Sequence, residues 1–260
     1  MRRLRRMAGL AGAAGLGLAL AGCVGPTALK PMLEDSEGYS ARYFQLDRLS
    51  PGGKAVLAPP GSEPLGFRRL TAKGRVQVSG TGQPDTHRIA VFERTLINDR
   101  NDGTVREIEL RTVDGLPLLV LYGLSYRGVA QLAVQQGQPA RNLALPILAL
   151  RSSSSWKSMA GLQENTAYDY VDSYGTGDPL MPSIKIERHC KSGTFYDAGK
   201  FLAGLPGQAI DLVCDDINSG GAKVSENRFV WLGQYGVVLP ARLTTLNGIT
   251  EMQYDSVTAQ

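Results

Sequence analysis

Short segments in which apolar and polar side chains alternate recur along most of this chain. Clear examples are 74–80 (GRVQVSG) and 104–113 (TVREIELRTV). A period of two places every second side chain on the same face of a strand. Turn signals such as Asn247-Gly248 are typical of hairpins between antiparallel strands. The pattern predicts a mainly β domain over 67–260, in which antiparallel meanders form a curved sheet, a half-barrel or a sandwich.

The clearest meander is predicted over 88–122, as three strands. Charged side chains recur at alternate positions such as Glu107, Glu109 and Arg111, which is typical of an antiparallel sheet with one face in water. We therefore predict that these charges lie on a solvated face. The apolar run 118–121 in the third strand predicts burial on both faces. The charged positions of its first two strands are Arg88, Glu93, Arg94, Arg106, Glu107, Glu109 and Arg111.

The first 22 residues have a different composition from the rest. Four arginines within 2–6 are followed by an uncharged run, 7–21, of mostly Ala, Gly and Leu. A basic start, a short apolar run and small residues before a cut site indicate a secretory signal. The run is too short and too rich in glycine for a spanning helix, which needs about 20 apolar residues. We predict that 1–22 is a removable signal peptide.

The end of this segment, Leu20-Ala21-Gly22-Cys23, resembles the lipobox of bacterial lipoproteins. The resemblance implies that the Cys23 thiol receives a diacylglycerol and that the chain is cut before Cys23. It also implies acylation of the new amino group by a fatty acid such as palmitate. In the lipoprotein sorting pattern an Asp after the cysteine retains the protein at the inner membrane. Val24 stands there instead, so the resemblance implies a lipid anchor at the periplasmic face of the outer membrane.

Removing the signal changes the charge of the protein. The formal charge of +4 equals the charge of the four signal-peptide arginines, so the mature chain is formally neutral. The isoelectric point near 9.0 therefore describes the precursor. Basic residues are scattered over the rest of the chain, and no nucleic-acid partner is predicted.

Residues 23–66 are predicted to be the lipidated N-terminus and a tether. Prolines remove backbone donors and interrupt both helices and sheets. A semi-extended segment would let a lipid-anchored domain stand off the bilayer. Within it, 39–49 is richer in apolar residues and predicts either a short helix or a first strand that docks on the body. A tail that is disordered throughout is the alternative. The prolines are Pro26, Pro31, Pro51, Pro59, Pro60 and Pro64.

Two cysteines, Cys190 and Cys214, remain after Cys23. An even pair in an exported chain predicts a structural disulfide. A loop of this length would stabilise the fold by about 3 kcal/mol in the chain-entropy model. A reactive thiol or a metal site with the adjacent His189 is the alternative, but no zinc-ligand spacing accompanies it.

The final strands carry a second resemblance. Segments 229–232 (FVWL), 235–239 (YGVVL) and 254–257 (YDSV) resemble the closing meander of LolA/LolB-like periplasmic half-barrel proteins. The resemblance implies a curved antiparallel sheet whose concave apolar face holds acyl chains. The helices that cover the sheet in that family are not evident in this sequence.

Catalytic motifs are weak. Ser154 and Lys157 satisfy S-x-x-K, and 191–194 (KSGT) is similar to an element of penicillin-binding proteins and serine β-lactamases, but the helical context is missing. The candidates for a hydrolytic triad are Ser154, His189 and Asp215, but no sequence motif supports such a triad. Asp211, Asp215 and Asp216 lack calcium-loop spacing. We predict no catalytic residues, no cofactor and no metal.

Three functions follow from these observations. The first is a non-enzymatic structural, assembly or interaction factor, held at the membrane by Cys23 and contacting other envelope proteins. The second is a carrier or sensor of a lipid or another apolar ligand. The third is a hydrolase of envelope polymers.

Overall fold

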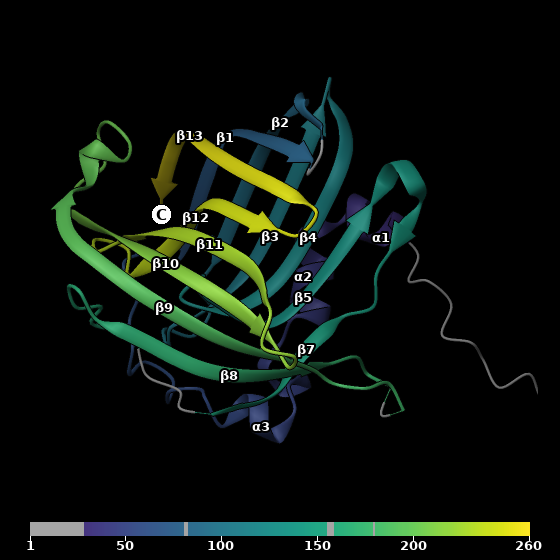
Figure 1. Ribbon diagram of the computed structural model, residues 1–260, viewed down its shortest axis with the longest axis horizontal. Coiled ribbons are helices and arrows are strands. Elements are labelled where there is room, and N and C mark those ends of the chain that lie inside the picture. Colours follow the sequence, from purple (N-terminus) through teal and green to yellow (C-terminus); the bar gives the residue numbers. More distant parts are fainter. Residues whose placement is uncertain (1–28, 81–82, 155–158, 179) are drawn as a thin grey trace, which may run out of the picture.

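The computed structural model describes residues 29–80, 83–154, 159–178 and 180–260 (Figure 1). Thirteen antiparallel strands are present in this part of the chain, and nearly all of them pair with their neighbours in sequence. The ring closes because β1 pairs with both β2 and β13. Twelve strands form this closed barrel, whereas the two-residue β6 pairs only with β5. The strands are β1 Arg69–Gly80, β2 Gln83–Ile97, β3 Thr104–Val113, β4 Leu116–Tyr126, β5 Ala130–Gln138, β6 Leu143–Ala144, β7 Leu148–Ser154, β8 Ala167–Gly175, β9 Ile184–Asp197, β10 Gln208–Asn218, β11 Lys223–Leu232, β12 Val237–Thr245 and β13 Gly248–Ala259.

The prediction of a mainly β domain with a curved antiparallel sheet is confirmed. The sheet closes into a barrel and does not stay open as a half-barrel. The predicted meander over 88–122 is present as β2, β3 and β4. Its second turn has positive φ angles at both Asp114 (51°) and Gly115 (76°). A two-residue hairpin of the type favoured by Asp-Gly requires this backbone conformation.

The barrel consists of two layers joined at two narrow contacts. Strands β12 and β13 pair only between 242–245 and 248–251. Strands β5 and β7 pair at two positions, Ala133 with Ala149 and Val134 with Leu148. Figure 1 shows the two layers, β13-β1-β2-β3-β4-β5 behind and β7 to β12 in front, with their strands crossing.

The hairpin of β11 and β12 is covered on both faces. Val230, Leu232 and Leu239 belong to one apolar cluster with residues of β1 and β2. Trp231 and Val238 belong to another with residues of β8, β9 and β10. Uninterrupted apolar runs are expected in strands buried on both sides, which accounts for the FVWL and GVVL segments.

Residues 29–54 of the predicted tether form three short helices on the outside of the barrel, α1 Leu29–Glu34, α2 Ser36–Tyr43 and α3 Pro51–Lys54, with a 3-10 turn, η1 Leu46–Arg48, between α2 and α3. Met32 and Phe44 are buried against Tyr122 of β4. The Tyr39 hydroxyl donates a hydrogen bond to Gln135 Oε1 at 2.6 Å. The short helix predicted within 39–49 therefore corresponds to α2 and η1, which dock on the barrel.

Gly52 of α3 lies against β7. A Cβ atom at this position would come within 2.2 Å of the carbonyl oxygen of Arg151. The Ser50 hydroxyl caps α3 by accepting a hydrogen bond from Gly53 N, and it also donates to the carbonyls of Leu150 and Arg151 within β7. The Gly-Gly pair thus permits close packing of a helix on a strand. No helix in the described part of the chain is long and apolar enough to cross a membrane.

Candidate functional site

Four charged side chains of β2 and β3 point into the barrel and bond to one another. Arg94 lies opposite Glu109 in the register of the two strands. Its Nη1 donates to Glu109 Oε2 at 2.8 Å, and its Nη2 donates to Glu107 Oε2 at 2.5 Å. Arg111 Nε donates to Glu109 Oε1 at 2.7 Å. Alternation along the strands places all four on one face, and we call these residues the lumen cluster.

The prediction that these charges face solvent is wrong for the lumen cluster, since the side chain of Glu109 is only 2% exposed and that of Arg94 is 12% exposed. The opposite, apolar face of β3 is also buried, because Ile108 packs under the N-terminal helices. Alternation shows that two faces differ, but it does not show which one faces the lumen. Arginine and glutamate at alternate positions of neighbouring strands are the sequence signal that points to cross-strand pairing.

The pKa values in the lumen cluster reflect this pairing. Burial alone would raise the pKa of Glu109, but Arg111 and Arg94 hold it below its ordinary value of 4.5. Burial alone would lower the pKa of Arg94, but Glu107 and Glu109 hold it above its ordinary range. In both groups the charged form is stabilised by its neighbours, so Glu109 and Arg94 face each other as an ion pair at neutral pH.

Donors exceed acceptors in the lumen cluster. Each oxygen of Glu107 and Glu109 already accepts a hydrogen bond, including one from Ser125 to Glu107. Arg94 Nε is buried and has no hydrogen-bond partner. Arg111 bonds only through Nε, so within the described residues its Nη1 and Nη2 have no protein acceptor. A buried donor without an acceptor is costly, which makes Arg94 Nε notable, whereas the unbonded Nη1 and Nη2 of Arg111 are not buried in this sense.

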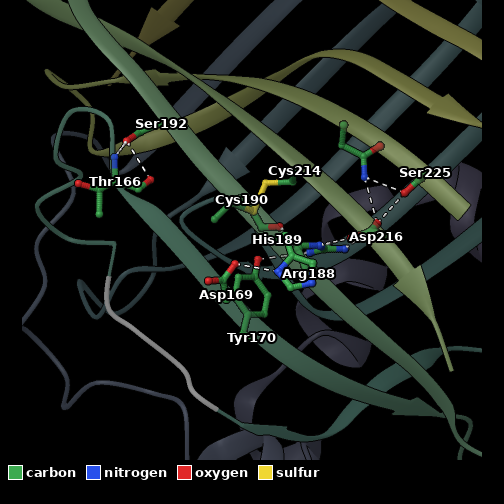
Figure 2. The surroundings of a disulfide bond; sticks show 12 residues. Thr166, Asp169, Tyr170, Arg188, His189, Cys190, Ser192, Cys214, Asp216 and Ser225 are labelled. Carbon is green, nitrogen blue, oxygen red and sulfur yellow. Dashed lines mark hydrogen bonds and ion pairs between the residues drawn. A yellow bond between two sulfur atoms is a disulfide. The ribbon is translucent and has the colours of Figure 1, made fainter. Parts of the chain in front are cut away.

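A second ion pair faces the same space from the other layer (Figure 2). Arg188 of β9 donates two hydrogen bonds to Asp216 of β10. Asp216 also accepts from Ser225 at 2.7 Å and from Asn227 at 3.1 Å. The remaining amino group of Arg188, Nη1, makes only long contacts of 3.4 and 3.5 Å. This arginine therefore also keeps donor capacity toward the lumen.

These groups line a cavity of about 250 Å³ inside the barrel, which we call the lumen cavity. Arg94, Arg111 and Arg188 lie on its wall, together with Asn227 and Met252. Its wall combines side chains from both layers of the barrel. The cavity is thus a feature of the closed fold rather than of one strand.

A second cavity, of about 390 Å³, lies at one end of the barrel and shares Arg111 with the first. We call it the mouth cavity. Its apolar wall includes Val76, Val78, Ala90 and Leu118, and its rim includes Arg141. Because Arg111 borders both cavities, the mouth cavity adjoins the charged lumen.

Helix α1 is attached at this same end. A Cβ atom on Gly137 of β5 would lie 2.7 Å from the Leu29 Cδ1 atom, so the two residues are in direct contact. The neighbouring residues Gln136 and Gln138 line the mouth cavity. Figure 1 shows α1 beside β5. The first described residue of the chain is therefore next to the mouth.

The predicted disulfide joins Cys190 and Cys214, which are directly opposite each other on β9 and β10 (Figure 2). Both cysteines are buried in the cluster that contains Trp231. The bridge lies beside the Arg188–Asp216 pair and fixes the two strands that carry it. The predicted lipidation residue, Cys23, lies outside the described residues.

The three residues considered for a hydrolase do not form a hydrogen-bonded triad. His189 contacts Asp169 at 2.9 Å and Glu187 at 3.1 Å, and its exposed side chain has a pKa raised by the hydrogen bond to Asp169. Asp215 lies opposite His189 in the register but pairs with Lys223 at 2.7 Å. Ser154 is on β7, with β8 between it and His189, which at strand spacing is about 10 Å away.

The other candidate motifs give no site in the described residues. Lys157 of the S-x-x-K match lies outside them. Asp211 bonds to Tyr196, whereas Asp215 and Asp216 point to opposite faces of β10 and have different partners. No group of three His, Cys, Asp or Glu side chains suited to a metal ion occurs among the residues that the structure describes.

Comparisons with family models, with curated proteins and with solved structures found no match to this chain.

Proposed function

We propose that the mature protein is a lipid-anchored lipoprotein of the bacterial cell envelope that carries or senses a ligand inside its barrel. The observation that carries this proposal is the position of the mouth cavity beside Leu29, at the end where the anchor segment joins. A cavity at the open end of a barrel is a common place for a ligand site. The lipobox-like residues before Cys23 support the anchor, and Val24 supports placement at the periplasmic face of the outer membrane.

The short anchor segment limits how far the barrel stands from the bilayer. Six residue steps separate Cys23 from Leu29. Even a fully extended chain covers no more than about 3.5 Å per residue, or about 20 Å in all. Since Leu29 packs beside the mouth, the mouth would lie within this distance of the lipid headgroups.

The charged lumen favours binding of a polar group over storage of a purely apolar ligand. Three arginines on the wall of a small cavity disfavour binding of an acyl chain without a polar head, because burying charge next to hydrocarbon is costly. The structural, assembly or interaction role stays a prediction, and the contacts of His189, Asp215 and Ser154 give the hydrolase no support.

Cell fractionation of the Cys23→Ser variant tests the anchor. We expect the wild-type protein in the membrane fraction, with a mature mass that begins at Cys23 and includes attached acyl chains. The variant should leave the membrane fraction or accumulate unprocessed. Wild-type protein that carries no lipid, or a variant that stays with membranes as mature protein, would rule out the anchor.

A further inference from the structure

The inner end of the site has unused hydrogen-bond donors. Arg94 Nε has no partner, Arg111 has two unused amino groups among the described residues, and Arg188 Nη1 makes only long contacts. Each carboxylate oxygen of Glu107 and Glu109 already accepts one hydrogen bond, and none of these bonds comes from the unused N–H groups. An occupant with two or three acceptor oxygens would satisfy these N–H groups. Guanidinium groups bind carboxylate and phosphate oxygens especially well.

The outer end of the site has the opposite chemistry. Val76 and Ala90 line the mouth cavity together with Leu118. Val76 and Ala90 face each other across β1 and β2 on the side that faces the lumen. An apolar chain placed here would be removed from water on most sides. Arg111 borders both cavities, so one molecule can reach from the apolar wall to the arginines.

We propose that the barrel binds a monoanionic amphiphile, with its carboxylate or phosphodiester head at Arg94 and Arg111 and its apolar chain in the mouth cavity. This inference rests on the proposed function, since the anchor holds the mouth close to the bilayer, where such molecules are concentrated.

The charges of the site suit a single negative charge. The three lumen arginines are balanced by Glu107, Glu109 and Asp216. Arg141 at the rim adds one positive charge. A neutral ligand would leave the unused donors without a strong acceptor, whereas a polyanion would be repelled by the three carboxylates.

Calorimetric titration of the full-length protein in nanodiscs of zwitterionic lipid tests the proposal, with empty nanodiscs as the blank. The probes are hexanoate, octanoate and decanoate, with octyl methyl phosphate, a diester with one charge, as the second anionic head and octanol as the uncharged match. Each added methylene should tighten binding about fourfold until the mouth cavity is filled. Equal binding of octanol and octanoate, or no binding of either anionic probe at millimolar concentration, would overturn the proposal. Inorganic phosphate alone should bind far more weakly than octyl methyl phosphate.

Two variants locate the binding. Arg111→Gln should weaken octanoate binding by about tenfold or more, because a charged hydrogen-bond donor is lost. Val78→Asp should have a similar effect by placing a like charge in the mouth. The matched control for the second is Ile89→Asp on the neighbouring strand, where Ile89 is 60% exposed on the outer face. The control should bind within about twofold of wild type. Unchanged binding in folded Val78→Asp, or an equal loss in Ile89→Asp, would place the ligand elsewhere.

The experiment separates the two proposals. Octanoate binding without a lipid on Cys23 would keep the ligand site and reject the anchored function. If the protein carries a lipid on Cys23 but binds no amphiphile, the anchor is retained and the proposed ligand is rejected.

Discussion

Replacing Arg94 by methionine should destabilise the barrel strongly. The substitution keeps much of the length of the side chain but removes hydrogen bonds to Glu107 at 2.5 Å and to Glu109 at 2.8 Å. Glu109 is 2% exposed and would keep only Arg111 as a cation. Removing one partner of a buried ion pair costs about 3–5 kcal/mol, because the remaining charge stays buried. For a domain of this size that cost lowers Tm by about 6–20 °C.

Thermal unfolding of the full-length protein, followed by circular dichroism at pH 7, measures this effect. Lys73→Met is the matched control, because the Lys73–Glu93 pair lies on the outer face with side chains 54% and 52% exposed. An exposed pair contributes about 1 kcal/mol or less. If Arg94→Met lowers Tm no more than Lys73→Met does, the lumen cluster does not contribute to stability as described.

The pH dependence gives an independent check of the same variant. In the wild type the pKa of Glu109 is held below 4.5 by Arg111 and Arg94. A carboxylate with a lowered pKa adds stability above its unfolded value, and that stability is lost as the pH falls through the folded value. Without Arg94 this contribution shrinks. The difference between variant and wild type should therefore be largest near neutral pH and should decrease below about pH 4.5.

Three further outcomes follow from the structure. Serine at both positions of the Cys190–Cys214 bridge should lower the free energy of unfolding by about 3 kcal/mol in denaturant titrations, and an unchanged midpoint would contradict a stabilising bridge. The pKa of His189 should lie above 6.5 in NMR titrations and should fall in Asp169→Asn. The small contribution of protonated His189 to stability is therefore present below pH 6.5 and is lost as the pH rises through the folded pKa. A His189 pKa that does not respond to Asp169→Asn would contradict the contact. Gly52→Ala should lower the free energy of unfolding by about 1–3 kcal/mol, because the added methyl group meets the Arg151 carbonyl. Gly177→Ala is the control and should lower it much less, because the space around Gly177 is open. Equal effects would argue against docking of α3 on β7.

The strands were largely predictable from the sequence, because alternation and turn residues act locally. Segment 104–113 is β3 in full, and Asp114-Gly115 forms the hairpin turn that its composition indicates. Closure was not predictable in the same way. It depends on pairing of β1 with β13, whose residues are far apart in the sequence and carry no mutual signal in a single chain.

The site was harder to predict than the strands. Glu107, Glu109 and Arg111 look like a solvated face because alternation does not distinguish the lumen from the solvent. The prolines of 23–66 suggest a tether, but Pro51 begins α3, where its missing N–H is not needed. Only the packing of Leu29 beside Gly137 relates the anchor to the mouth, and that contact joins segments more than a hundred residues apart.

Site-specific photocrosslinking in native membranes shows whether the mouth of the barrel faces the bilayer. A photoreactive side chain would replace Arg141, at the rim of the mouth, or Lys200, in the turn that follows β9. Ala198 of this turn belongs to one apolar cluster with Phe67, just before β1, and Tyr235, between β11 and β12, so the turn lies at the other end of the barrel. Position 141 should crosslink to lipid, whereas position 200 should not. Lipid crosslinks at 200 but not at 141 would show that the mouth points away from the bilayer and would contradict the account.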